Sequence, residues 1–255
     1  VQTVDWAEHG LDVLPESIGE LQSLEVLHAY RNALTALPAS IGRLHALKRL
    51  GVFENKLTEL PESIGELQSL EGLHAYTNAL TGLPASIGRL HALKSLGVNE
   101  NKLTELPEAI GELQSLGVLH AGTNALTALP ASIGQLHALQ SLGVNENKLT
   151  ELPEAIGELQ SLERLDAFKN ALTALPASIG RLHALKTLAV FENKLTELPE
   201  SIGELQSLEE LRAGTNALTA LPASIWRLRA LKMLAVFENK LTELPESIGE
   251  LQSLE

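Results

Sequence analysis

Residues 47–69 read LKRLGVFENKLTELPESIGELQS, and the following residues repeat the same pattern of leucine, asparagine, Leu-Pro and Ile-Gly positions. The pair Leu60-Pro61 recurs every 23 residues, from Leu14-Pro15 to Leu244-Pro245, and these eleven pairs contain every proline of the chain. Asparagine keeps the same period at ten positions: Asn32, Asn55, Asn78, Asn101, Asn124, Asn147, Asn170, Asn193, Asn216 and Asn239. A fixed period without insertions predicts a solenoid, in which each repeat contacts its neighbours.

The repeat L-x-x-L-x-x-L-x-A/V-x-x-N-x-L-x-x-L-P-x-x-I-G-x resembles a leucine-rich repeat of the 23-residue class over essentially the whole chain. Its L-P-x-x-I-G-x-L ending is similar to the Ras-suppressor, Scribble-like and Roco-protein type, and to repeat arrays of bacterial effector proteins. The resemblance implies an α/β leucine-rich-repeat solenoid, a horseshoe with a parallel concave β-sheet of short strands and a 3₁₀ or irregular convex side. It names no partner and no reaction, because one fold supports many functions.

Each repeat is predicted to contain one short strand and one tight turn. The segment Leu27-His28-Ala29-Tyr30 alternates apolar and exposed positions, which is typical of a strand. The asparagine that follows is expected to satisfy backbone groups in its own and the neighbouring repeat. Beyond Pro38, leucine and isoleucine recur every third residue, which favours 3₁₀ turns. Gly42 is expected to end such a turn in a left-handed conformation.

The chain is interpreted as two parts. Residues 1–13 are a degenerate N-terminal rung or cap, and residues 14–255 are the repeats, in which alternate units differ and form a 46-residue super-repeat. No C-terminal capping unit is evident, and a homodimer through this uncapped end would cover it. Trp226 stands where all the other copies have glycine, which makes it a candidate docking or oligomer contact.

Composition limits the classes of partner. The formal net charge of -13 argues against nucleic acid and membrane surfaces, which attract clustered Lys and Arg, and favours protein or peptide partners. The chain has no cysteine, and we recognise in it no signal peptide and no apolar run long enough to span a bilayer. We therefore favour an intracellular, cytoplasmic setting, or the host cytosol for a bacterial effector.

Candidate binding residues occupy exposed strand positions that vary between repeats. All phenylalanines and tyrosines share one column, and rows of exposed rings are typical of binding hot spots. With neighbouring strand residues they predict a partner-binding concave face made of Tyr30, Phe53, Tyr76, Phe168, Phe191, Phe237, His28, His74, Arg49, Arg164 and Arg212. Stacking that merely stabilises the sheet is the alternative interpretation. The column after the rings is mostly acidic, which favours partners with basic surfaces.

Metal and enzyme chemistry are both disfavoured. His28, His74 and His120 lie two repeats apart, so strand spacing separates them by about 10 Å, too far for one ion to bridge. The chain lacks phosphate-loop and hydrolase motifs, and its repeated groups form rows where a catalytic site needs a unique convergence. We expect no cofactor, no metal and no enzyme activity.

Three functional hypotheses remain. The leading one is a non-catalytic protein-binding module that uses its concave face. The first alternative is the substrate-recruiting domain of a larger bacterial effector enzyme. The second is a designed or recently amplified repeat scaffold with no natural ligand, which is compatible with the near identity of residues 93–113 and 139–159.

Overall fold

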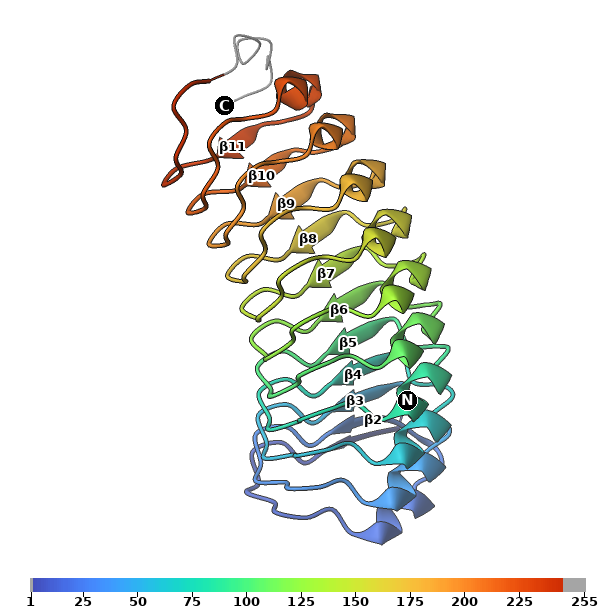
Figure 1. The fold of residues 1–255 in the computed structure, drawn as a ribbon. Coiled ribbons are helices and arrows are strands. Elements are labelled where there is room, and N and C mark those ends of the chain that lie inside the picture. Colours follow the sequence, from blue (N-terminus) through green and yellow to red (C-terminus); the bar gives the residue numbers. More distant parts are fainter. Residues whose placement is uncertain (1, 245–255) are drawn as a thin grey trace. The chain divides into compact units, whose positions relative to one another are not determined.

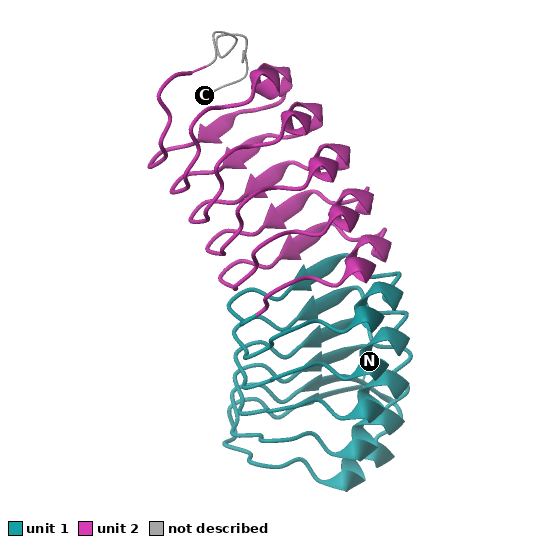
Figure 2. Cartoon of the chain, viewed as in Figure 1, with its two compact units in different colours: residues 1–125 teal, residues 126–255 magenta. Residues whose placement is uncertain are grey.

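The computed structural model describes residues 2–244 of the chain. The chain divides into two compact units, unit 1 (Val1–Ala125) and unit 2 (Leu126–Glu255), coloured separately in Figure 2. Strands and 3₁₀ turns alternate along each unit, with the turns on the side away from the strands (Figure 1). Residues 251–255, which carry the predicted uncapped end and its homodimer contact, lie outside the described residues.

Unit 1 contains short strands joined by five-residue 3₁₀ turns. Its strands are β1 (Gln2–Asp5), β2 (Leu24–His28), β3 (Arg49–Gly51), β4 (Gly72–His74), β5 (Ser95–Gly97) and β6 (Val118–His120). Its turns are η1 (Glu16–Glu20), η2 (Ala39–Arg43), η3 (Glu62–Glu66), η4 (Ala85–Arg89) and η5 (Glu108–Glu112). Each turn follows a Leu-Pro pair, because proline fixes φ and has no N–H to leave unsatisfied.

Unit 2 repeats this arrangement. Its turns are η6 (Ala131–Gln135), η7 (Glu154–Glu158), η8 (Ala177–Arg181), η9 (Glu200–Glu204) and η10 (Ala223–Arg227). Its strands are β7 (Ser141–Gly143), β8 (Arg164–Asp166), β9 (Thr187–Ala189), β10 (Glu210–Arg212) and β11 (Met233–Ala235).

The strands of each unit pair in parallel, in chain order. In unit 1, Leu27 pairs with Leu50 and Leu50 with Leu73, so the register advances by one repeat per strand. In unit 2, Leu165 pairs with Leu188 and Leu188 with Leu211 in the same way. Parallel strands alternating with 3₁₀ turns confirm the fold class predicted from the repeat.

The strands end two residues earlier than the sequence indicated. Strand β2 ends at His28, so Tyr30 lies beyond it. Hydrogen bonds still tie this segment to the next repeat, since Arg31 N donates to Phe53 O at 3.0 Å. The aromatic column therefore lies just past the strand ends, on backbone that the neighbouring repeat holds in place.

A left-handed residue follows the aromatic column in every described repeat. Arg31, Glu54 and Thr77 have φ angles of 53°, 52° and 52°, and eleven non-glycine residues of the described chain have positive φ. This conformation costs an L-residue roughly 1–2 kcal/mol, so the surrounding structure must hold it in place.

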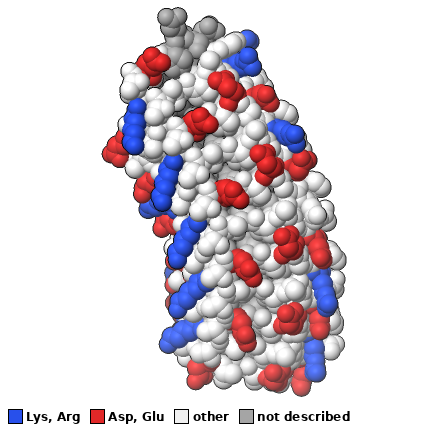
Figure 3. All heavy atoms as spheres, viewed as in Figure 1, with Lys and Arg blue, Asp and Glu red and all other residues white. Residues whose placement is uncertain are grey.

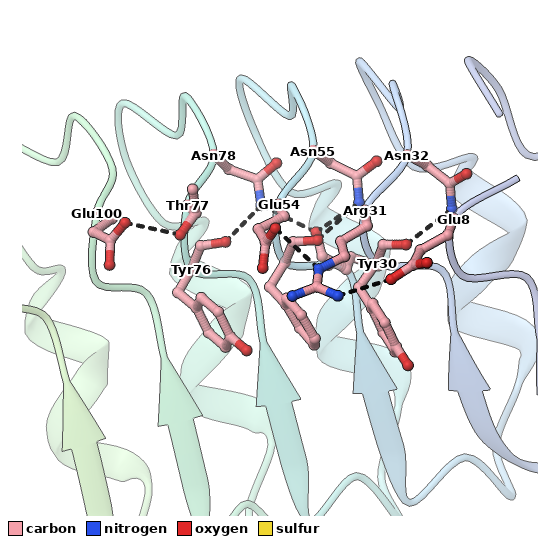
Figure 4. Close-up of polar contacts among 12 residues, drawn as sticks. Glu8, Tyr30, Arg31, Asn32, Glu54, Asn55, Tyr76, Thr77, Asn78 and Glu100 are labelled. Carbon is pink, nitrogen blue, oxygen red and sulfur yellow. Dashed lines mark hydrogen bonds and ion pairs between the residues drawn. The ribbon is translucent and has the colours of Figure 1, made fainter. Parts of the chain in front are cut away.

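The asparagine ladder provides that support. In unit 1, Asn55 Nδ2 donates to Val52 O at 3.0 Å and to Ala29 O of the preceding repeat at 2.9 Å. Its Oδ1 accepts a hydrogen bond from Leu34 N at 3.0 Å. Neighbouring asparagines stand side by side along the unit (Figure 4). One amide thus satisfies backbone groups of two repeats, as the sequence predicted, and removing it would leave donors and acceptors unpaired.

The prediction for Gly42 was wrong. Among the described residues, only Gly10 is a glycine with positive φ. Gly42 is required by packing, because a Cβ at this position would lie 2.5 Å from the carbonyl oxygen of Ser63 in the next turn. Gly180 of unit 2 has the same relation to Ser201, also at 2.5 Å. Successive 3₁₀ turns are too close together for a side chain here.

The leucine and isoleucine positions form the core of each unit. Leu27 and Ile41 in unit 1, and Leu165 and Ile179 in unit 2, have no exposed surface. Burial of such a side chain stabilises the folded state by about 1.5–3 kcal/mol. Because successive repeats supply the same set, the core of each unit holds neighbouring strands such as β2 and β3 or β8 and β9 in register and leaves their other face to solvent.

Candidate functional site on the strand faces

The solvent-facing side of the strands is called the strand face here, and the positions two residues past each strand form the ring column. In unit 1 the ring column contains Tyr30, Phe53, Tyr76, Asn99 and Gly122. In unit 2 it contains Asn145, Phe168, Phe191, Gly214 and Phe237.

The three rings of unit 1 form a continuous stack. The centroids of Tyr30 and Phe53 are 4.3 Å apart with planes inclined by 6°, and those of Phe53 and Tyr76 are 4.4 Å apart with planes inclined by 12°. All three side chains are half-buried, and Tyr30 and Tyr76 project to the same side of the strands (Figure 4). Stacked pairs contribute about 0.5–1.5 kcal/mol each. The stack therefore stabilises unit 1 and also presents an apolar edge to solvent.

The rings of unit 2 are arranged differently. Phe168 and Phe191 stack with centroids 4.4 Å apart and planes inclined by 7°. Phe237 is 61% exposed and lies over Gly214, where a Cβ would be 2.8 Å from two of its ring carbons. Unit 2 thus has one stacked pair and one ring open to solvent.

A hollow of about 460 Å³ opens on the strand face of unit 1. It is lined by His28, Tyr30, Arg49, Leu50, Gly51, Phe53, Glu71, Gly72, His74, Lys94 and Ser95. Gly51 lies between His28 and His74 in the pairing of the strands, and its missing side chain leaves the space. A Cβ at Gly51 would lie 3.7 Å from the rings of both Phe53 and Tyr30, so the aromatic stack borders the hollow.

Arg49 is the unpaired charge of this hollow. Its side chain is exposed and makes no hydrogen bond or ion pair with any other residue between 2 and 244. Lys94 instead forms an ion pair with Glu71 at 3.0 Å. This hydrogen bond from Lys94 lowers the pKa of Glu71, and the positive charges of Lys48 and Arg49 lower it further. Two cations and one carboxylate give the lining a net charge of +1 when its imidazoles are neutral.

His74 lies beside Arg49 in the hollow. Burial lowers the pKa of His74, and the positive charges of Arg49 and His120 lower it further, so the imidazole is neutral at pH 7. Its Nε2 is 3.4 Å from Ser95 Oγ. His28 contacts the same hollow, and its Nδ1 is 3.8 Å from the Asp5 carboxylate. The structure thus brings His28, His74, Arg49, Tyr30 and Phe53 together, while Tyr76 completes the adjoining stack.

The other two predicted arginines are neutralised within their own strands. Arg164 Nε donates to Asp166 Oδ2 at 2.7 Å in β8, and Arg212 Nη2 donates to Glu210 Oε2 at 2.8 Å in β10. Both pairs join residues two positions apart, which project from the same side of a strand. Arg49 and Arg164 thus occupy equivalent strand positions and Arg212 occupies the position of His28, and only Arg49 has an available charge.

Several side chains of the acidic column beside the rings form hydrogen bonds or ion pairs with the neighbouring repeat. Arg31 donates to Glu8 at 2.7 Å and to Glu54 at 3.1 Å, and Thr77 donates to Glu100 at 3.0 Å (Figure 4). These contacts join the left-handed residues of adjacent repeats. Arg31 thereby offsets part of the negative charge of Glu8 and Glu54 beside the unit 1 rings.

A ladder of exposed ion pairs runs along each unit. Lys48 pairs with Glu25 at 2.9 Å in unit 1, and Lys186 pairs with Glu163 at 2.8 Å in unit 2. On the face drawn in Figure 3, acidic side chains lie in rows along each unit, basic side chains form a separate row at the left edge, and further basic side chains lie among acidic ones at the right. Exposed pairs contribute about 0.2–1 kcal/mol, so this ladder is a minor source of stability.

Trp226 lies in η10 and is half-buried, with the guanidinium of Arg227 5.6 Å from its ring centroid. Its backbone is not left-handed, so tryptophan meets no conformational penalty at this position. In the preceding turn, Gly203 is required because a Cβ would lie 2.5 Å from Ser224 O. Residues 245–255 lie outside the described residues, and the role of Trp226 as a docking or oligomer contact stays a prediction.

Some residues of the hollow were missed by the sequence analysis. Gly51 and Gly72 create its space, while Glu71, Lys94 and Ser95 complete its polar lining. The alternation of histidine and glycine at His28, Gly51 and His74 was a usable signal, because a small residue between two large ones leaves a gap. Within residues 2–244, no group of three or more His, Cys, Asp or Glu side chains is arranged to hold a metal ion.

Four segments, residues 5–82, 83–174, 132–216 and 173–255, match a family model described as a leucine-rich repeat region. The chain belongs to the leucine-rich repeat family. This confirms the resemblance drawn from the Leu-Pro and asparagine periods. No curated protein sequence matches the chain.

Solved structures similar to the chain include a leucine-rich repeat protein of Leptospira interrogans, with 34% identity, a TM-score of 0.63 and coverage of 100% of this chain and 77% of that one. A TDR receptor has 33% identity and a TM-score of 0.90, with coverage of 100% and 46%. The Arabidopsis receptor kinase HAESA, in complex with the peptide hormone IDA and the co-receptor SERK1, has 31% identity and a TM-score of 0.73, with coverage of 96% and 46%. The chain thus spans less than half of each of these two receptor chains. In its described part, no helix has the length and apolar character needed to cross a membrane.

Proposed function

We propose that the chain is a non-catalytic protein-binding module that holds a peptide or an extended protein segment on the strand face of unit 1. One observation carries the proposal: the Tyr30–Phe53–Tyr76 stack borders a hollow that also contains the unpaired guanidinium of Arg49. Apolar ring edges supply contact area, and an unpaired charge supplies orientation. Aromatic residues and arginine are also the types enriched in binding hot spots.

The scaffold beneath this surface favours a preformed site. The Asn55 amide and the buried leucines hold the ring-bearing segment in place before any partner arrives. A rigid surface reduces the entropy lost on binding. The similarity to HAESA, whose structure contains a peptide hormone, supports a peptide as the class of partner.

The hollow does not favour catalysis. Ser95 Oγ and His74 Nε2 form the one pairing in it that resembles a nucleophile and a base, and they are 3.4 Å apart. This is longer than the contact of about 2.6–3.2 Å that is typical of a base positioned for proton abstraction. We assign these two residues to the polar lining of a binding surface.

We assign unit 2 a weaker contribution. Phe168, Phe191 and Phe237 offer apolar contact, but Arg164 and Arg212 are engaged by carboxylates of their own strands. A partner that reached unit 2 would have to break these pairs to use either guanidinium.

The test is selection of binders from a random library of displayed peptides, followed by affinity measurement with the Phe53→Ala and Phe191→Ala variants. Phe53 is the middle ring of the unit 1 stack, and Phe191 is the matched ring of unit 2. We expect Phe53→Ala to weaken binding at least about tenfold, as for a hot-spot residue, and Phe191→Ala to weaken it less. If no peptide is selected, or if the selected peptides bind the Phe53→Ala variant as tightly as the native chain, the proposal is overturned.

A further inference from the structure

We propose that the hollow of unit 1 receives the carboxylate of an aspartate or glutamate side chain of the bound peptide, held by Arg49, with an adjacent apolar side chain of the peptide against the Tyr30–Phe53–Tyr76 stack. This inference rests on the proposed function and specifies the chemistry of the partner. It differs from the expectation of basic partners that the acidic column suggested.

The guanidinium of Arg49 is suited to bind a carboxylate. Arginine presents a planar set of donors that matches a carboxylate in a bidentate arrangement. Among residues 2–244, Arg49 has no such partner, whereas Arg164 has Asp166 and Arg212 has Glu210. The position two residues after Arg49 is Gly51, which has no side chain to offer.

The surroundings of Arg49 are also suited to one carboxylate. Glu71, the acidic residue in the lining, is already bound by Lys94 at 3.0 Å, and its negative charge is thereby offset. Ser95 and His74 supply neutral polar groups in the same hollow. A single unpaired cation matches a singly charged side chain better than a doubly charged phosphate, which would require further cations.

The acidity of the whole chain does not oppose this assignment. The net charge of -13 is spread over the molecule, and charges further apart than about 10 Å are largely screened at ordinary ionic strength. The local lining, with Arg49 and the Lys94–Glu71 pair, carries net positive charge. Elsewhere on the strand face, Arg164 and Arg212 are already paired with carboxylates, so neither guanidinium is available to a peptide carboxylate.

The aromatic stack determines where the rest of the peptide lies. Tyr30 and Phe53 line the hollow together with Arg49, so an apolar side chain next to the acidic one reaches the ring edges. The volume of about 460 Å³ is enough for one or two side chains and too small for a folded element. We therefore assign the occupant as a short acidic-apolar segment in an extended conformation.

The experiment compares N-acetylated, C-amidated peptide pools in which one position is fixed as glutamate or glutamine beside a fixed phenylalanine, with the flanking positions randomised. Blocked termini exclude recognition of a free terminal carboxylate. Affinities are measured by fluorescence polarisation for the native chain and for the Arg49→Ala and Gly51→Asp variants. Arg164→Ala is the matched control, because it removes an arginine from the same position of another strand.

We expect the native chain and Arg164→Ala to prefer the glutamate pool over the glutamine pool by about tenfold, the value of a hydrogen-bonded charge pair. Arg49→Ala should abolish this preference, and so should Gly51→Asp, which places a carboxylate where Asp166 stands relative to Arg164. A Cβ at Gly51 meets only ordinary contacts, so this variant is expected to fold. Circular dichroism and thermal midpoints check the fold of each variant.

Equal binding of both pools by the native chain, or a preference that survives Arg49→Ala, overturns the carboxylate assignment. If peptides bind and depend on Phe53 but show no preference for glutamate, the proposed function stands and only this inference fails. If neither pool nor any displayed peptide binds, both fail.

Discussion

The strand faces of unit 1 and unit 2 are built on the same backbone and differ in how their charges are distributed. In unit 1, Arg49 borders a hollow and has no ion-pair partner among the described residues. In unit 2, Arg164 is bound by Asp166 at 2.7 Å. The difference shows that a repeat can keep its scaffold constant while one residue, two positions along the strand, decides whether a cation is available to a partner.

The aromatic columns differ in the same manner. Phe53 stacks on both sides, whereas Phe191 stacks on Phe168 and is followed by Gly214. Unit 1 therefore combines a longer apolar edge with an available charge. Unit 2 has a shorter apolar edge, and its two strand-face arginines form ion pairs with carboxylates of their own strands.

The largest expected effect tests whether the two units share one scaffold. Asn55→Ala in unit 1 and Asn193→Ala in unit 2 each remove an amide that bonds backbone groups of two repeats. Buried groups left unpaired cost about 1–3 kcal/mol each, so each variant should lose about 3 kcal/mol in free energy of unfolding. Urea unfolding measures both. Losses that differ by more than about 1 kcal/mol would show that the units are not equivalent scaffolds, given typical scatter between sites.

The next effect sharpens the comparison of the rings. Phe53→Ala breaks two stacked pairs and Phe191→Ala breaks one. With about 0.5–1.5 kcal/mol for each pair beyond the apolar burial that both variants lose, we expect Phe53→Ala to lose about 1 kcal/mol more than Phe191→Ala, measured by thermal unfolding with circular dichroism. Equal losses would mean that the stacks do not contribute and that burial alone determines the result.

A smaller effect concerns the arginines, and here the larger loss of stability is expected in unit 2. Arg164→Ala removes an ion pair from Asp166, whose side chain is only 16% exposed, and should destabilise unit 2 by about 1 kcal/mol. Arg49→Ala removes an exposed, unpaired side chain and should change the free energy of unfolding by less than about 0.5 kcal/mol. Urea unfolding of both variants provides the comparison. A larger loss for Arg49→Ala would reveal a structural role for this residue and weaken its assignment to binding.

The smallest effect is a pH dependence specific to unit 1. The pKa of His74 is lowered in the folded state by burial and by the charges of Arg49 and His120. As pH falls through the unfolded value of about 6.5, the unfolded chain binds more protons than the folded chain, so the free energy of unfolding decreases. Once pH is below the folded pKa, both states are protonated and no further loss occurs.

His74→Asn should remove this contribution. Thermal midpoints between pH 7.5 and pH 5.5, an interval of about one unit on each side of the unfolded pKa, should fall less for the variant than for the native chain. Parallel profiles for the two proteins would show that His74 does not titrate differently on folding. The matched substitution is His183→Asn in unit 2, which removes a histidine that lies outside the strand face.

Most residues of the site were identified from the sequence, but the pairing of its arginines with carboxylates was not predicted. The ring column, His28, His74 and the arginines were identified from their recurrence at strand positions. The carboxylates at Asp166 and Glu210 lie two residues from their arginines, so the sequence did contain this signal. It was missed because columns were compared across repeats, whereas the deciding contacts lie along single strands.

The sequence by itself determined the repeat, the parallel register, the 3₁₀ turns and the asparagine ladder. It could do so because the contacts of a solenoid join equivalent residues of neighbouring repeats, so one period specifies all of them. Only the tertiary structure decided that Gly42 is needed for close packing of turns, that left-handed backbone falls at Arg31 and Glu54, and that Arg49 borders an open hollow. These depend on distances between stacked turns and on where long side chains end, which residue types and spacing do not specify.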